Sequence, residues 1–278
     1  MKRKNHIIIS SHSAKVSDLT ELYNYFDLLS FMVLRDVKVL YKQTVLGFSW
    51  AFIRPFTMMV VFTFIFGNLA KIPSNNIPYP IFTFSALLPW LYFSSSVAKS
   101  TQSIIGGRTM YTKVYFPRII IPLTSVFSSL VDFIISNIIL FGMLIYFRIV
   151  PSYNLLWFPY LVCIMILNTA GFSFWFSSLS VQYRDIKHAI SFLNQILMYA
   201  APVVWPISLL QDKFGEKFVY FYSIYPMVGV IEGFRSSIIP DQEFPIYLVL
   251  ISSFTSCIVF ISGYYFFNKK EKYFADIS

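Results

Sequence analysis

Very few side chains in this sequence are suited to covalent or metal chemistry. The chain has 278 residues with three histidines and two cysteines, and both Cys163 and Cys257 lie inside apolar runs, where thiols usually pack as small core residues. Two cysteines with no histidine nearby do not make a metal site. The sequence contains no phosphate-binding loop, no G-x-S-x-G motif, no H-E-x-x-H motif and no glycine-rich dinucleotide turn. We therefore expect no catalytic residue, no metal and no cofactor in this chain.

One acidic residue lies in an unusual place. Asp132 is the only charge in the apolar stretch from Ile119 to Phe147. A carboxylate at membrane depth is costly and is a candidate for a functional role. The alternative is that a hydrogen bond to Ser128, Ser129 or Ser136, or to another helix, fixes the packing of this segment. A direct role in transport and a packing role both stay open for this intramembrane acid.

A pair of opposite charges follows a short apolar run. Residues 218–231 make up 14 residues, too few to cross a bilayer, and we expect them to dip into it and return. Pro226 and Gly229 suit two short helices at the outer face, and Glu232 and Arg235 are spaced to pair on one helical face. These four residues are our candidates for a gate. The alternative is a surface loop with scattered aromatic residues.

The composition indicates the environment in which this chain folds. Apolar residues make up 56% and charged residues 13%, whereas soluble domains average roughly 25% charged residues. This balance excludes a soluble enzyme, a disordered chain and a disulfide scaffold, and it indicates a polytopic membrane protein. Aromatic residues reach 20%, more than apolar bulk alone requires.

Stretches almost free of charge define the expected membrane helices, each needing about 20 apolar residues. We predict an all-α integral membrane protein with six transmembrane helices, an N-terminal amphipathic helix and re-entrant gate helices. The expected parts are a cytoplasmic N-terminus at 1–43, a membrane domain at 44–268 with spans at 44–70, 81–105, 118–147, 153–180, 189–210 and 245–267, a loop at 106–117, an outer gate segment at 211–244, and a cytoplasmic tail at 269–278.

The positive charges orient these spans. With a cytoplasmic N-terminus, 17 of the 22 lysines and arginines lie on the cytoplasmic side and 5 on the other. Such an asymmetry places both termini in the cytoplasm. The positive net charge of +9 is then explained by topology and anionic lipid rather than by nucleic acid.

Residues 18–42 have the pattern of an amphipathic helix. Apolar residues recur every three or four positions from Leu19 to Leu40, while Arg35, Lys38 and Lys42 fall on nearly the opposite side. We expect a helix lying in the cytoplasmic interface. A helix packed on a soluble partner is the alternative.

The loop between the second and third spans has an apolar face. After the pair Gly106-Gly107 come Met110, Tyr111, Val114 and Tyr115, and Pro117 then suits the first turn of the next helix. Exposed aromatic residues on such a loop indicate a docking surface. The alternative is a helix lying against the membrane.

Four ordered segments, Leu34–Pro55, Leu87–Pro122, Gln182–Ser208 and Tyr225–Arg235, together resemble the type-2 permease family of ABC exporters. The likeness covers residues 19 to 268 and is closest to permeases for lipid-linked O-antigen or related cell-surface polysaccharides. It implies a homodimer in a bacterial inner membrane that binds two copies of an ATPase carrying ATP and Mg. It also implies that the amphipathic helix and the loop at 106–117 contact this ATPase, and that aromatic residues line the channel.

The resemblance assigns three groups of candidate residues. The residues for coupling to the ATPase are Arg108, Met110, Tyr111, Lys113, Val114, Tyr115, Phe116 and Pro117. The candidates for a lipid-phosphate entrance are Arg35, Lys38, Lys42 and Arg54. The candidate channel aromatics are Phe48, Phe52, Phe56, Trp90, Tyr92, Tyr199 and Trp205, for each of which packing or anchoring at the membrane interface is an equal alternative.

Two positions depart from the family pattern, with Ile119 where members commonly have Glu and Arg54 where they often have Gln. The expected function is the membrane subunit of an exporter that moves lipid-linked O-antigen from cytoplasm to periplasm, without enzymatic activity of its own. A capsule or teichoic-acid exporter is the nearest alternative. A membrane-embedded transferase would need more acids than Asp132 and Asp185, and a secondary transporter would normally show internal repeats.

Overall fold

The computed structural model describes residues 23–42, 47–74, 77–107, 114–240, 242–271 and 274. The first part of the predicted amphipathic helix, residues 18–22, lies outside this range. So do Arg108, Met110, Tyr111 and Lys113 of the predicted coupling loop, and so does the side chain of Phe48.

The described residues form helices and connecting segments without a strand, which confirms the all-helical class. Within the described residues, five helical segments are long and apolar enough to cross a membrane. They are α3 (Trp50–Phe62) with its π-helical continuation η2 (Thr63–Leu69), α4 (Tyr79–Gly106), α6 (Ile120–Tyr146), η3 (Tyr153–Trp157) with α7 (Phe158–Gln182), and α12 (Ile246–Glu271).

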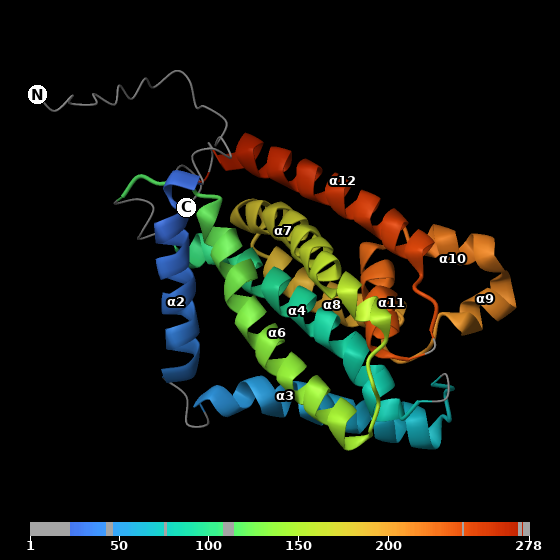
Figure 1. Ribbon diagram of the computed structural model, residues 1–278. Coiled ribbons are helices and arrows are strands. Elements are labelled where there is room, and N and C mark those ends of the chain that lie inside the picture. Colours follow the sequence, from blue (N-terminus) through green and yellow to red (C-terminus); the bar gives the residue numbers. More distant parts are fainter. Residues whose placement is uncertain are drawn as a thin grey trace, which may run out of the picture.

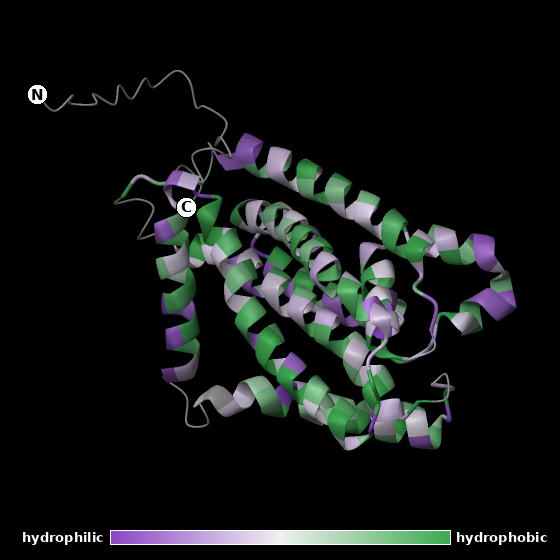
Figure 2. Cartoon of the chain, viewed as in Figure 1, coloured by the Kyte–Doolittle hydropathy of each residue, from purple (hydrophilic) through white to green (hydrophobic). Residues whose placement is uncertain are grey.

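The long helices run side by side, and α2 (Phe26–Lys42) lies across one end of them (Figure 1). The central helix is α4, which packs on α6 and α7 and is buried along most of its length. On the other side of α7 lies α12. Figure 2 shows apolar residues along the long helices and polar residues on α2, on α9 (Ser208–Phe214) and α10 (Glu216–Tyr222), and at the C-terminal end of α12. The polar elements thus lie at the two ends of the bundle.

The expectation of one continuous helix over 189–210 is wrong. The helix α8 (Ile186–Ala200) has 15 residues, and α9 begins only at Ser208. Ala201 is extended, with φ −87° and ψ 150°, as residues before a proline usually are. Pro202 and Pro206 lack the N–H groups that a continuing helix needs. At about 1.5 Å per residue, α8 alone falls short of a hydrocarbon core of about 30 Å.

The segment expected to hold two short helices holds three. Between α9 and α10, Gly215 turns the chain with a φ of +82°, a conformation that favours glycine. The third helix, α11 (Pro226–Ile238), is buried at every residue and packs on α4, α7 and α12. The N–H of Gly229 donates to the Ser252 hydroxyl at 3.0 Å, and a Cβ at Gly229 would meet that same side chain. The glycine therefore allows α11 to approach α12 closely.

The crossing of α7 and α12 also depends on glycine. A Cβ built on Gly263 would lie 2.4 Å from the backbone oxygen of Gly171, and one built on Gly171 would lie 2.7 Å from the backbone nitrogen of Phe260. Small residues allow membrane helices to approach to backbone contact, where van der Waals packing is strongest. These two glycines thus fix the position of α12 against the rest of the bundle.

Candidate functional site

The amphipathic helix α2 packs on α6 through part of its predicted apolar stripe. Leu29 is buried, and Val33 and Val37 are half-buried. Phe26 and Leu40 of the same stripe remain exposed in the single chain. The cations Lys38 and Lys42 are exposed as well. The helix is therefore amphipathic, with one apolar side packed on α6 and its lysines exposed. Its place in the membrane interface stays a prediction.

Asp132 joins three helices. On α6 its Oδ1 accepts a hydrogen bond from the hydroxyl of Tyr41 on α2, and its Oδ2 lies 3.4 Å from the ammonium of Lys99 on α4. The same ammonium lies 3.3 Å from the Ser129 hydroxyl. Burial and the neighbouring carboxylate raise the pKa of the Tyr41 hydroxyl, so Tyr41 stays protonated and donates. We call Tyr41, Lys99 and Asp132 the interhelical cluster.

The structure distinguishes among the partners considered for Asp132. Ser136 donates to the backbone oxygen of Asp132 at 2.8 Å and approaches the backbone oxygen of Ala51 at 3.4 Å. The carboxylate itself contacts the two other helices. Asp132 therefore has the interhelical contact foreseen as its packing role, and a direct role in transport stays a prediction.

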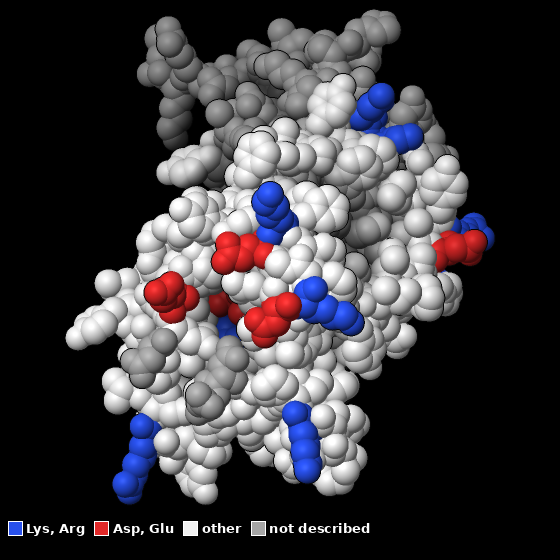
Figure 3. Space-filling model, turned by 90° about the vertical axis from the view of Figure 1, so that its right-hand side faces the viewer, with Lys and Arg blue, Asp and Glu red and all other residues white. Residues whose placement is uncertain are grey.

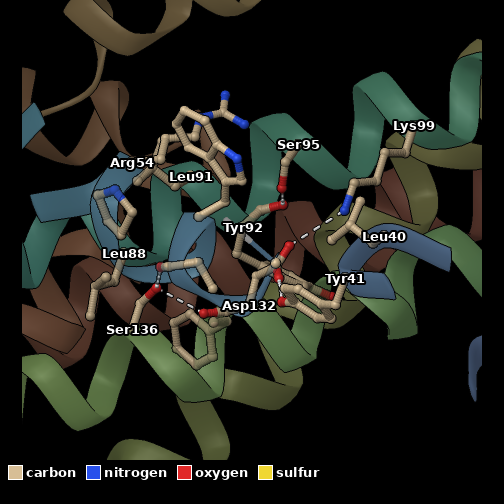
Figure 4. A pocket seen from close by; sticks show the side chains of 15 residues that line it. Leu40, Tyr41, Arg54, Leu88, Leu91, Tyr92, Ser95, Lys99, Asp132 and Ser136 are labelled. Carbon is tan, nitrogen blue, oxygen red and sulfur yellow. Dashed lines mark hydrogen bonds and ion pairs between the residues drawn. The ribbon is translucent and has the colours of Figure 1, made fainter. Parts of the chain in front are cut away.

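Two cavities meet at this cluster. The first has a volume of about 320 Å³ and extends between α3, α4 and α6, with Arg54, Leu88, Tyr92 and Asp132 among its walls (Figure 4). The second, of about 750 Å³, lies between α2, α4 and the start of α6, and Arg35 lines it. Leu40, Tyr41 and Lys99 line both cavities and so lie between them.

The predicted lipid-phosphate residues are divided by the structure. Arg54 lines the first cavity and Arg35 lines the second, where it also contacts Asp36 at 2.8 Å. Lys38 and Lys42 are described but are not among the residues lining either cavity. Sequence reasoning did not select Lys99 as a site residue, although the predicted span at 81–105 contains it, because it was counted with the cytoplasmic cations. Its position inside the predicted span was the signal that could have identified it.

The predicted channel aromatics lie in two different environments. Trp90 and Tyr92 on α4 are each only 2% exposed and pack against Phe93 and Phe133. These two are core residues within the single chain. Others are accessible from outside: Phe56 and Tyr199 are exposed, and Phe52 and Trp205 are half-buried. Which of them line a channel stays a prediction.

The coupling loop is described only at its C-terminal base. Val114 and Tyr115 are exposed, and Phe116 and Pro117 are buried. Arg118 follows, and its guanidinium donates to the backbone oxygen of Glu271 at 2.7 Å, which ties the start of α6 to the end of α12. Ile119 is 3% exposed, so an apolar residue suits this position.

The four gate candidates all lie in the buried helix α11. Arg235 is fully buried and donates to Glu232 Oε1 at 2.5 Å and to the backbone oxygen of Pro202 at 2.5 Å. Its guanidinium also lies 3.9 Å from the ring centre of Phe82 on α4. Burial raises the pKa of Glu232, and the neighbouring guanidinium opposes this shift. The predicted pair is therefore formed, and it fixes α11 to the bend after α8.

The end of the molecule that carries α9 and α10 bears charges of both signs, interspersed on one face (Figure 3). Asp212, Lys213, Glu216 and Lys217 of these two helices are exposed. Unlike α11, the helices α9 and α10 lie largely outside the core, and a gate in this region stays a prediction. No group of three or more potential metal ligands occurs in the described part of the chain.

Similarity to known proteins extends over most of the chain. The pattern of the ABC-2 type transporter family matches residues 27–239. The O-antigen export system permease protein RfbA of Myxococcus xanthus is 31% identical over 228 residues, covering 80% of this chain and 86% of that protein. The protein of the same name from Klebsiella pneumoniae is 28% identical over 91% of this chain and 95% of its own length. The polysialic acid transport protein KpsM of Escherichia coli is 20% identical over 75% of this chain and 80% of its own.

Proposed function

The chain belongs to the ABC-2 type transporter family of membrane proteins, and on that premise we propose that it exports a lipid-linked O-antigen polysaccharide. Its role is that of the transmembrane subunit of a polysaccharide exporter. The observation that carries the proposal is the similarity to O-antigen export permeases across most of both chains. A capsular polymer is the second candidate cargo, supported by the more distant likeness to a polysialic acid transport protein.

Several finer features belong to the same proposal. Two copies of the chain would form the channel, and two copies of an ATPase would bind and hydrolyse ATP with Mg. The protein would lie in the inner membrane of a bacterium with both termini in the cytoplasm. The distribution of cations supports this orientation. So does the common position of α2 and the C-terminal end of α12 at one end of the bundle (Figure 1).

The contacts around α2 and α6 suggest how ATP-driven motion reaches the membrane helices. Closure of the ATPase would push on the loop before α6 and on α2. The interhelical cluster connects α2 to α4 and α6, and the contact between Arg118 and Glu271 connects the loop base to α12. A displacement of α2 would therefore shift α4 and α6 together. Aromatic residues on the channel side would let sugar rings slide past without demanding one sequence of sugars.

The function is tested by complementation. We expect this chain, expressed with its own ATPase, to restore O-antigen at the surface of a strain that lacks both its O-antigen permease and its capsule permease. The readout is the polysaccharide ladder on a lipopolysaccharide gel, together with surface labelling by antibody. The matched control carries an ATPase with an inactive phosphate-binding loop and should show no polymer. Restoration of a capsular polymer alone would favour the second candidate, and restoration of neither polymer would contradict the proposal.

Docking of the ATPase gives a separate prediction for Tyr115, whose side chain is 79% exposed beside the buried Phe116. Replacing Tyr115 by alanine should weaken binding of the ATPase, because truncating an aromatic side chain at the centre of an interface costs about 2 kcal/mol or more. Copurification and ATP hydrolysis in liposomes measure the effect. The control is Tyr153→Ala, which removes an aromatic side chain that is 94% exposed at the opposite end of the molecule. Equal copurification of both variants would show that Tyr115 does not dock.

A further inference from the structure

The ammonium of Lys99 is held where two cavities meet. It lies 3.4 Å from Asp132 Oδ2 and 3.3 Å from the Ser129 hydroxyl, and its side chain is 35% exposed. An ammonium has three N–H donors, and these two contacts use two of them. Because Lys99 lines both cavities, the third donor is available to a group that enters either of them.

The first cavity combines positive charge with apolar walls. Arg54 and Lys99 contribute two positive charges, and Asp132 contributes the negative charge among the lining residues. Leu88, Leu91 and other apolar side chains make up much of the remaining wall. In Figure 4, Lys99 and Tyr41 approach Asp132, while Arg54 lies at the other end of the group. Such a cavity suits an anionic head group with an attached hydrocarbon chain.

The acid beside Lys99 orients this cation. A lysine near the end of a membrane helix usually extends its ammonium to the aqueous interface. Asp132 instead keeps the ammonium at the cavity, and the hydroxyl of Tyr41 holds the carboxylate from the opposite side. Asp132 and Tyr41 would therefore act on a ligand through the position of Lys99.

We propose that Lys99 binds the phosphate group of a lipid in this cavity, with Arg54 as a second cationic contact and with Asp132 and Tyr41 as positioning residues. The inference rests on the proposed function for its ligand class, the phosphate or diphosphate ester of a lipid. Two sources share this chemistry, namely the diphosphate of the polysaccharide's lipid carrier and the phosphate of a membrane phospholipid. The site adds Lys99 to the cations that the sequence had indicated and excludes Lys38 and Lys42 from it.

Binding is measured on the chain in complex with its ATPase, in nanodiscs of zwitterionic phosphatidylcholine. A short polyprenyl diphosphate, phosphatidylglycerol and inorganic pyrophosphate are the three probes, and the fluorescence of Trp50, which lines the cavity, reports their binding. Trp50→Phe identifies the part of the signal that comes from this residue. Preference for the polyprenyl diphosphate assigns the site to the lipid carrier, and equal binding of phosphatidylglycerol assigns it to phospholipid. Binding of pyrophosphate alone would overturn a lipid site.

The variants separate a binding role from general electrostatics. Lys99→Gln should weaken binding about tenfold, the loss expected for one charge-assisted hydrogen bond, and Lys99→Arg should restore most of it. Lys187→Gln is the matched control, because it removes one exposed cation at the start of α8 without touching either cavity, and it should leave binding unchanged. Equal weakening by Lys187→Gln and Lys99→Gln would overturn the proposal.

For Asp132→Asn, the direction in which the binding affinity changes distinguishes two explanations. If net charge alone governed binding, removing this carboxylate would tighten it. Because Asp132 positions Lys99, we expect weaker binding instead, with an unfolding midpoint that shows the variant to be folded. Tighter binding would overturn the positioning role. None of these measurements needs transport, so Lys99-dependent binding in a chain that fails complementation would contradict the proposed function while leaving this site standing.

Discussion

Replacing Arg235 by methionine should remove most of the folded protein from the membrane. The guanidinium is fully buried, and its loss leaves the Glu232 carboxylate without its cationic partner and the backbone oxygen of Pro202 without the donor that Arg235 supplies. Breaking a buried ion pair by removing one partner typically destabilises a protein by about 3–5 kcal/mol. Yield of monodisperse protein in size-exclusion chromatography and the thermal unfolding midpoint both measure this loss.

The double variant Glu232→Leu with Arg235→Met tests the physical reason. Because it removes both charges, it should recover much of the stability that the single variant loses. Lys213→Met is a further control, since it removes an exposed cation from α9 and should change the midpoint little. A single Arg235→Met variant as stable as the native protein would show that the pair does not hold α11 in place.

The second large effect is expected where α7 crosses α12. Gly263→Ala places a methyl group 2.4 Å from the backbone oxygen of Gly171, closer than atoms can approach, and backbone cannot move aside as a flexible side chain can. The helices must separate, and overpacking of this kind typically destabilises by about 1–3 kcal/mol or more. Gly171→Ala should act similarly, because its Cβ would lie 2.7 Å from the backbone nitrogen of Phe260. Thermal unfolding in detergent measures both changes.

Gly142 offers a matched control in α6. A Cβ at this position meets no atom within 4 Å, so Gly142→Ala adds the same methyl group without a clash. Its stability should stay the same or rise by up to about 1 kcal/mol, because alanine is the better helix former. If Gly142→Ala and Gly263→Ala lower the unfolding midpoint equally, helix crossing is not the cause.

The helical class was readable from the sequence because apolar length and helical periodicity are local properties. The runs that become α4, α6, α7 and α12 agree with the expected segments to within a few residues. The prediction of a continuous helix through the segment after α8 was also wrong for a local reason. The predicted span was a run of uncharged residues, and Pro202 and Pro206 were included in it because they carry no charge. Proline lacks the N–H group that a continuing helix needs, so the helix ends before them.

Contacts between helices were less predictable. Tyr41 and Asp132 are 91 residues apart, and the sequence around either residue does not predict a contact with the other. The spacing of Glu232 and Arg235 did predict their pairing, because three residues on a helix bring two side chains to one face. Their complete burial depends on how α11 packs against α4 and the bend after α8, and spacing carries no information about that packing.

The short helix α8 and the bend that follows it affect how the chain enters the membrane during synthesis. A segment of 15 helical residues followed by turns and bends is a weak substrate for insertion machinery that recognises about 20 apolar residues. The backbone oxygen of Pro202 accepts from Arg235, which is made 33 residues later, and that of Val204 accepts from Tyr79, which is made long before. Since unpaired backbone groups are costly in lipid, α8 should be integrated stably only after α11 has left the ribosome. The last third of the chain would thus insert as one unit rather than helix by helix.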